Sequence, residues 1–258
     1  MTFIDSHTHL YLDAFDDDRH EVIKRAISSG VKFMLFPNID SQSVAPMEKT
    51  CSQFKNHCFP MMGLHPTHVD DSYEQELATI RKHLDSNNYI AVGEIGIDLY
   101  WDKTFRKEQT EVFRTQIGWA IQKQLPIVIH ARDSFEQIYD VVADMNCDAL
   151  TGVFHCFTGT ETQAHKMLAL GGFKLGIGGV LTFKNAGLDK TLQSISLEHL
   201  ILETDAPYLA PTPYRGKRNE SSYIPLIAQK LADINNTSVE TVAAITTKNT
   251  KELFKLPI

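Results

Sequence analysis

Eight short apolar runs recur along this chain, and polar or amphipathic segments separate them. The runs cover residues 3–5, 33–36, 59–63, 90–92, 127–129, 152–154, 173–177 and 200–202. Between runs, apolar residues recur at helical spacing, as at Val22, Ile23, Ala26 and Ile27, so that each helix can pack one face against a sheet. Strands that alternate with helices in this way form parallel sheets. Eight such units predict an α/β protein with the (β/α)8 TIM-barrel fold.

The length and the C-terminal pattern indicate one domain. A (β/α)8 barrel commonly fills about 250 residues, so we expect the whole chain, residues 1–258, to form a single domain. After the last run, two extra C-terminal helices are predicted, the first around Ile224–Leu231 and the second over Val239–Phe254. Thr237 and Glu240 have the spacing of a capping box and are expected to begin the second of these helices.

The composition is that of an ordinary enzyme, with 43% hydrophobic and 22% charged residues. The net charge of −7 disfavours a broad nucleic-acid-binding surface, so any contact with phosphate should be local. The chain has no apolar stretch of about 20 residues and no signal peptide, so we expect a cytoplasmic protein without membrane association. We also expect no obligate protein partner. The cysteines lack zinc-type spacing and are expected to be reduced: they are Cys51, Cys58, Cys147 and Cys156.

Metal-competent side chains follow five of the eight runs. They are His7 and His9, Glu94, His130, His155, and Asp205. Because the carboxyl ends of barrel strands converge on one mouth, these side chains should lie close together. Strand alternation also predicts that Asp5 projects to the same side as the two histidines of the first run. A single polar residue at a strand end is ordinary turn chemistry, but five strand ends that agree indicate a site.

The order of the strands predicts how these side chains share two cations. Barrel closure brings the eighth strand beside the first, so Asp205 can join the two histidines of the first run at one cation. His130 and His155 come from adjacent strands and can bind a second cation, and Glu94 can bridge the two. We therefore expect two divalent metal ions, Zn, Mg or Mn, which together favour hydrolysis by an activated water. Asp205 is the candidate general base, and Glu94 is the second candidate catalytic residue.

These residues lie in stretches that resemble the TatD-type metal-dependent hydrolases of the amidohydrolase superfamily. The matching stretches are Asp5–Leu10, Gly63–Pro66, Gly93–Asp98, Ile129–Arg132, Phe154–Gly159, Glu203–Leu209 and Arg215–Glu220. The resemblance implies a binuclear site of His7, His9, Glu94, His130, His155 and Asp205, with deoxyribonuclease activity as the usual assignment. The chain departs from the family pattern at Ser221, where a proline generally follows the Asn-Glu pair. We expect this change to affect the stiffness of a loop and no metal ligand.

Three further side chains follow the predicted strands. His65 can contact a substrate phosphate, bind an additional ion, or play a structural role beside Pro66. Arg132 should point into the mouth, where it can hold a phosphate or pair with a carboxylate such as Glu203. Cys156 should face the helix layer and pack there, because the ligand before it points inward.

The loops around the mouth add candidate substrate contacts. Arg215, Lys217 and Arg218 form a basic cluster after the last strand, which is either a grip for a substrate backbone or a solvated loop. Asp98 is a candidate partner that orients a metal-binding histidine. Trp101 can stack on a nucleobase or pack beneath its loop.

Three classes of function follow from these features. The leading reading is an exonuclease-type deoxyribonuclease that hydrolyses phosphodiester bonds at DNA ends, because two metal ions and a local basic rim suit phosphoryl transfer. The alternative is an amide or ester hydrolase, such as a deacylase, that uses the same metal pair. A zinc-stabilised scaffold without turnover is disfavoured by the candidate base and the full set of candidate ligands.

Overall fold

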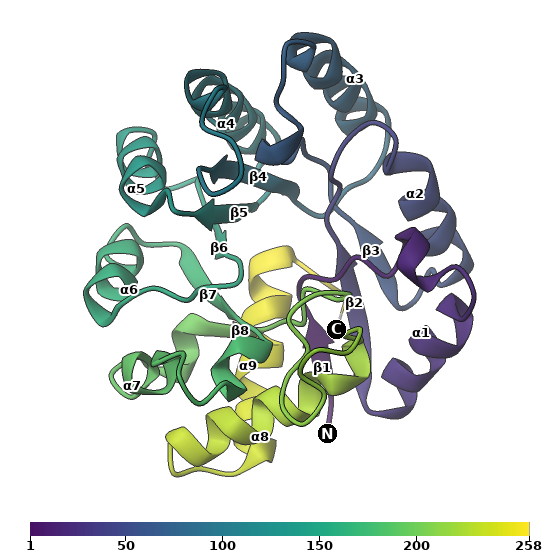
Figure 1. Ribbon diagram of the computed structural model, residues 1–258, viewed down its shortest axis with the longest axis vertical. Coiled ribbons are helices and arrows are strands. Elements are labelled where there is room, and N and C mark those ends of the chain that lie inside the picture. Colours follow the sequence, from purple (N-terminus) through teal and green to yellow (C-terminus); the bar gives the residue numbers. More distant parts are fainter. Residues whose placement is uncertain (258) are drawn as a thin grey trace.

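Eight parallel strands form a closed barrel (Figure 1). In this computed structural model, which describes residues 1–257, the strands are β1 (Phe3–Asp5), β2 (Val31–Phe36), β3 (Cys58–Pro60), β4 (Val92–Asp98), β5 (Ile127–Arg132), β6 (Gly152–Phe154), β7 (Phe173–Ile177) and β8 (Leu200–Leu202). One ladder joins β1 to β3 and another joins β4 to β8. Isolated bridges between Met62 and Val92 and between Thr8 and Ala206 connect the two ladders. The predicted (β/α)8 fold is therefore confirmed.

Helices surround the barrel (Figure 1). They are α1 (Arg19–Ser28), α2 (Val44–Gln53), α3 (Tyr73–Ser86), α4 (Arg106–Lys123), α5 (Phe135–Asp144), α6 (Glu161–Leu168), α7 (Leu188–Leu192), α8 (Ile224–Ile234) and α9 (Val239–Phe254). The predicted C-terminal pair corresponds to α8 and α9, but the predicted cap of α9 is wrong. Ser238 accepts the backbone N–H of Thr241 at 3.1 Å. Thr237 instead donates its own N–H to Ala232 at 3.1 Å and so belongs to the turn that ends α8.

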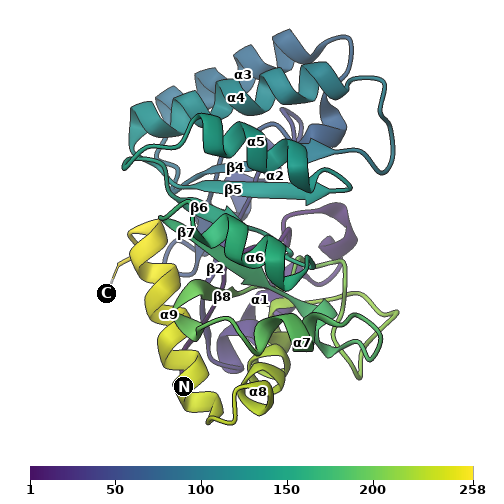
Figure 2. The ribbon, with the colours of Figure 1, turned by 90° about the vertical axis from the view of Figure 1, so that its left-hand side faces the viewer.

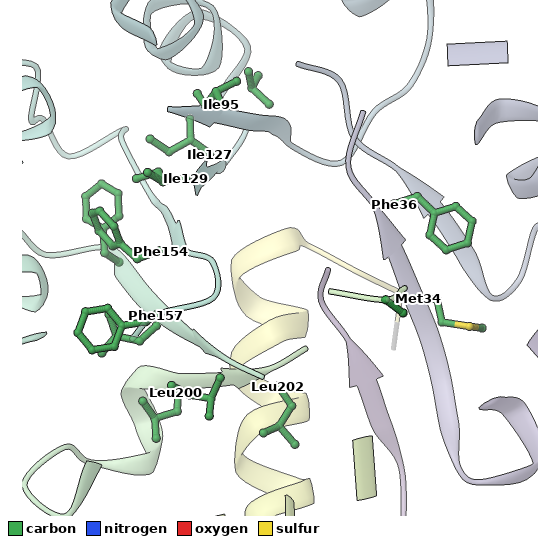
Figure 3. Packing of buried hydrophobic residues seen from close by; sticks show 14 of the residues in the cluster. Met34, Phe36, Ile95, Ile127, Ile129, Phe154, Phe157, Leu200 and Leu202 are labelled. Carbon is green, nitrogen blue, oxygen red and sulfur yellow. The ribbon is translucent and has the colours of Figure 1, made fainter. Parts of the chain in front are cut away.

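The barrel has two apolar layers. Outward-facing strand residues such as Phe36, Ile129 and Leu202 pack toward the helices (Figure 3). The inner layer contains Ile4, Phe33, Leu35, Met61, Ala91, Val128, Val153 and Ile201. Leu253 and Phe254 of α9 belong to this inner cluster, so α9 covers one end of the barrel (Figure 2).

The carboxyl ends of the strands lie at the other end, as the arrowhead of β5 shows by pointing away from α9 in Figure 2. The loops that follow β1, β4, β5, β6 and β8 therefore open onto one mouth, where barrel enzymes place their chemistry. Among residues 1–257, no helix combines the length and the apolar character needed to cross a bilayer.

Candidate metal centre

The six predicted metal-site side chains meet at this mouth, and four of them form a first group of donor atoms. His7 Nε2 lies 3.2 Å from His9 Nε2 and 3.1 Å from Glu94 Oε2. Asp205 Oδ1 lies 3.7 Å from His7 Nε2 and 3.6 Å from His9 Nε2. His9 Nε2 and Glu94 Oε2 are 3.6 Å apart.

These separations fit a bound cation. Ligands about 2.1 Å from a tetrahedral zinc ion lie about 3.4 Å from one another, and the separations in the first group range from 3.1 to 3.7 Å. Two imidazole nitrogens and two carboxylate oxygens are also a donor set that Zn²⁺ accepts. The residues of the first group are therefore suited to hold one divalent ion.

The other oxygen of Glu94 faces a second group of imidazoles. Glu94 Oε1 lies 2.9 Å from His130 Nδ1, 3.2 Å from His155 Nε2 and 3.4 Å from His65 Nε2. His65 Nε2 and His130 Nδ1 are 3.3 Å apart. Glu94 thus contributes one oxygen to each group, in the position of a bridge.

Burial and neighbouring charges set the protonation of the site. Burial lowers the pKa of His7 to about 4 and lowers the pKa of His9 well below its usual value. Burial alone would raise the pKa of Glu94, but the surrounding histidines bring it well below its usual range. Burial also disfavours the charged form of His155, yet the carboxylates of Glu94 and Glu203 raise its pKa well above the usual value. At neutral pH, His7 and His9 therefore present free lone pairs and Glu94 presents its charge, which are the forms that bind a cation.

Hydrogen bonds on the outer nitrogens orient two of the imidazoles. Tyr11 donates its hydroxyl to the Pro37 carbonyl at 2.6 Å, so its oxygen can accept the His9 Nδ1–H at 2.9 Å. Asp98 Oδ2 accepts a hydrogen bond from His130 Nε2 at 2.8 Å, as predicted for this acid. Both contacts place the proton on the outer nitrogen and leave the inner nitrogen available to a cation.

Glu203 contacts the outer nitrogen of His155, a partner that the sequence did not predict. Glu203 Oε1 lies 3.1 Å from His155 Nδ1 and accepts the backbone N–H of Cys156. Gly176 leaves the necessary space, because a Cβ at that position would lie 2.2 Å from Glu203 Oε2. The available signal was the position of Glu203 in the same strand end as the predicted base.

His65 is oriented as a hydrogen-bond donor. Its Nδ1 accepts the backbone N–H of Thr67 at 3.2 Å, so the neutral ring carries its proton on Nε2. Burial lowers the pKa of His65, which favours that neutral form. His65 Nε2 faces Glu94 and His130 within the second group, so His65 can serve as an additional ligand or, with its proton on Nε2, donate to a substrate.

Asp205 has a left-handed backbone. Its φ of 59° lies in a region that aspartate and asparagine enter more readily than other residues with a side chain. Its N–H donates to the His7 carbonyl at 2.9 Å, and its carbonyl accepts the Tyr208 N–H at 2.8 Å, so both sides of the residue are fixed. Burial raises the pKa of Asp205 to about 7, and a cation beside it would lower that value.

Two predicted orientations are wrong. Asp5 does not join the donor groups, because it accepts the N–H and the hydroxyl of Thr204 at 2.9 and 2.6 Å and ties the end of β8 to β1. Cys156 lines the pocket above the donor groups and not the helix layer. The regular strands end at Asp5 and at Phe154, so the alternation of faces does not extend to the residues that follow. Burial raises the pKa of the Cys156 thiol to about 12, which keeps it unreactive.

A pocket of about 650 Å³ lies over both donor groups. Its lining includes the predicted substrate contacts His65 and Arg132. The Arg132 guanidinium lies 3.8 Å from the centre of the Tyr100 ring, while Glu203 is fully buried against His155, so the considered pairing of Arg132 with Glu203 is not made.

The basic loop after β8 divides into two parts. Arg218 pairs with Asp18 at 2.6 Å, so its charge is compensated within the fold and it does not belong to a free basic cluster. Arg215 and Lys217 do not line the pocket, and the Arg215 guanidinium lies 4.4 Å from the centre of the Phe183 ring. Both residues can contact only a substrate that extends beyond the pocket.

Known proteins resemble this chain over nearly its whole length. The sequence profile of the family described as TatD related DNase matches residues 4–255. The chain is 36% identical over 253 residues to the uncharacterized metal-dependent hydrolase YabD of Bacillus subtilis, with 98% of each protein covered. It is 31% identical over 248 residues to the 3'-5' ssDNA/RNA exonuclease TatD of Erwinia tasmaniensis, which covers 94% of this chain and 95% of that protein.

A solved structure agrees with this similarity. The crystal structure of YjjV, a TatD homologue from Escherichia coli, superposes with a TM-score of 0.92 at 26% sequence identity. The superposition covers 99% of this chain and 98% of that chain, so the likeness includes the barrel and the loops around its mouth.

Proposed function

The chain belongs to the TatD-related DNase family of metal-dependent hydrolases, and from this premise we propose a binuclear enzyme that hydrolyses phosphodiester bonds at DNA ends. One observation carries the proposal: Glu94 Oε2 lies 3.1 Å from His7 while Glu94 Oε1 lies 2.9 Å from His130. A carboxylate shared by two sets of imidazoles supports a pair of divalent cations. Such ions would polarise a phosphoryl oxygen and make a water acidic enough to attack at neutral pH.

The side chains of the pocket accept the proton of the attacking water and bind the phosphate. Asp205 is the proposed general base, and it accepts a proton from the attacking water as the water oxygen bonds to phosphorus. The bond from phosphorus to the leaving sugar oxygen breaks, and that oxygen takes up a proton from solvent. His65 Nε2–H can donate to a non-bridging phosphate oxygen, and Arg132 offers a planar cation in the same pocket.

Two observations favour nucleic acid as the substrate. The relative from Erwinia tasmaniensis is named as an exonuclease of single-stranded DNA and RNA. Within a protein of net charge −7, Arg132 lies at the pocket, and Arg215 and Lys217 follow β8. Local cations of this kind are what a phosphodiester backbone binds.

A neighbouring acidic pocket favours the alternative of an amide or ester hydrolase. This pocket of about 920 Å³ shares Tyr208 with the first one, and its lining includes Asp13, Asp16 and Asp17. Clustered carboxylates repel a polyanion and tolerate a neutral or cationic group. A carbonyl substrate with such a group would therefore fit across the two pockets.

Assays of the metal-reconstituted protein on single-stranded DNA, on RNA and on a panel of esters and amides test the proposal. We expect stepwise release of mononucleotides that stops with a chelator and returns with a divalent cation. Asp205→Asn, purified in parallel, reveals any contaminating nuclease. Turnover confined to the esters or amides would refute the nuclease proposal and support an amide or ester hydrolase. No turnover on any of these substrates would refute both proposals.

A further inference from the structure

Among residues 1–257, five large apolar side chains are exposed; three of them line the candidate metal pocket, and a fourth, Tyr100, directly precedes one of these three. Tyr100 and Trp101, after β4, are 52% and 72% exposed, and Tyr208 and Leu209, after β8, are 54% and 40% exposed. The fifth is Met1, at the chain terminus. Trp101, Tyr208 and Leu209 line the same pocket as the donor groups. Apolar area gathered at one mouth is typical of a site for a ligand with apolar faces.

The chain beneath the rings after β4 is tied to the metal centre. Asp98 Oδ1 accepts the backbone N–H groups of Tyr100 and Trp101 at 3.0 and 3.4 Å, while Asp98 Oδ2 contacts His130 at 2.8 Å. The Arg132 guanidinium lies 3.8 Å from the centre of the Tyr100 ring and 5.3 Å from that of Trp101. The exposed Trp101 indole is therefore attached to a fixed backbone and lies beside the guanidinium cation of Arg132.

The chain beneath Tyr208 is fixed as firmly. The Tyr208 N–H donates to the Asp205 carbonyl at 2.8 Å. The side-chain amide of the buried Asn219 donates to the Tyr208 carbonyl at 2.6 Å and to the Thr204 carbonyl at 2.8 Å. A fixed main chain beneath each ring lowers the entropy that is lost when a flat ligand stacks on it.

The two anchored rings belong to opposite sides of the barrel, because β4 and β8 face each other across it (Figure 1). The donor groups use side chains that follow both of these strands. We propose that Trp101 and Tyr208 stack two successive nucleobases of single-stranded nucleic acid, with the phosphodiester between them at the donor groups. This inference rests on the proposed function and specifies its substrate.

The geometry has two consequences for specificity. Bases held on opposite sides of the mouth are unstacked from each other and cannot pair with a complementary strand, so a blunt duplex must fray before it binds. Every nucleobase can stack on an aromatic ring, so the affinity should depend little on the base sequence of the strand. Arg132 can contact the phosphate next to the base on Trp101.

Equilibrium binding tests the inference without turnover. The chain has two tryptophans, Trp101 and the half-buried Trp119 of α4, so Trp119→Phe leaves Trp101 as the single reporter. In the metal-loaded Asp205→Asn protein, which is expected to keep its cations and to turn over slowly, we expect oligothymidylate to quench Trp101 fluorescence and an abasic strand of the same length to leave it unchanged. Trp101→Ala and Tyr208→Ala should each weaken binding of oligothymidylate roughly 5- to 150-fold, as measured by anisotropy. Trp101→Phe and Tyr208→Phe keep a ring and should retain most of the affinity.

Kinetics on substrates with one base removed complete the test. Removing the base on either side of the scissile bond should raise KM for the unmodified protein. In Trp101→Ala, removing the base that stacks on Trp101 should no longer change KM. In Tyr208→Ala, the same should hold for the base that stacks on Tyr208. Equal binding of base-containing and abasic strands by the unmodified protein and both alanine variants would overturn the inference. Cleavage without quenching and without an abasic effect leaves the proposed function standing and refutes the stacking. Quenching without cleavage refutes the proposed function and leaves the stacking.

Discussion

At the scale of single residues, Glu94 is the side chain on which both donor groups depend. Its two oxygens lie 3.1 Å from His7 and 2.9 Å from His130, so Glu94→Ala should lose bound metal and activity together. Elemental analysis after reconstitution measures the metal, and Glu240→Ala on the exposed start of α9 is the matched control. A Glu94→Ala protein that retains two ions would refute the bridge, and unmodified protein without any ion would refute the binuclear site.

Asp205 allows the roles of ligand and base to be separated. Asparagine keeps an oxygen for a cation, tolerates the left-handed backbone at φ 59° and cannot accept a proton. Asp205→Asn should therefore retain much of its metal while turnover falls by about 10²–10⁴. Metal content and kcat are measured on the same preparation. Near-normal turnover would assign the base to another residue.

The sequence could indicate which side chains gather at the mouth but not what holds them. Polar residues after apolar strands point to a common edge, and the structure brings the six predicted ones together there. Tyr11 and Glu203 were missed, because their bonds to His9 and His155 depend on side-chain directions that a place at a strand end does not fix. Asp5 was misplaced because the alternation of faces holds only within a regular strand.

At the scale of elements, hydrophobic periodicity predicted most of the strands and helices of the barrel. It did not predict the ends of the strands that carry polar site residues or the residue that begins α9. β4 and β5 continue to Asp98 and Arg132, past the apolar runs, because Glu94, Asp98, His130 and Arg132 interrupt the apolar pattern within these strands. Apolar patterns thus report the core and not the ends of elements.

The start of α9 provides a matched test of helix capping. Ser238 Oγ accepts the Thr241 N–H at 3.1 Å, so Ser238→Ala should lower the free energy of unfolding by about 1 kcal/mol. Thr237→Ala removes the hydroxyl that the sequence pattern favoured and should have little effect. Urea unfolding followed by circular dichroism compares the two variants. A larger loss for Thr237→Ala would restore the cap predicted from the sequence.

At the scale of the whole molecule, the sequence showed the net charge but not which cations are free. Arg218 is compensated by Asp18, which lies 200 positions earlier in the chain, whereas Arg132 lies over the Tyr100 ring and keeps its charge at the pocket. Such partners come from loops that only the closed barrel brings together. Arg215 and Lys217 remain the basic residues proposed to meet a long substrate.

The salt dependence of binding tests that proposal. Each phosphate neutralised on a single strand contributes roughly 0.7 to the slope of log affinity against log salt, so Arg215→Ala combined with Lys217→Ala should reduce the slope by about 1.4 and weaken binding at low salt. Turnover of a small phosphodiester should change little, because neither residue lines the pocket. Lys248→Ala with Lys251→Ala, on α9 at the closed end of the barrel, removes the same charge far from the mouth and should leave the slope unchanged. If the Arg215 and Lys217 double variant keeps the affinity and slope of the unmodified protein, the loop is a solvated surface, and the nucleic-acid contacts are confined to the pocket and its aromatic rim.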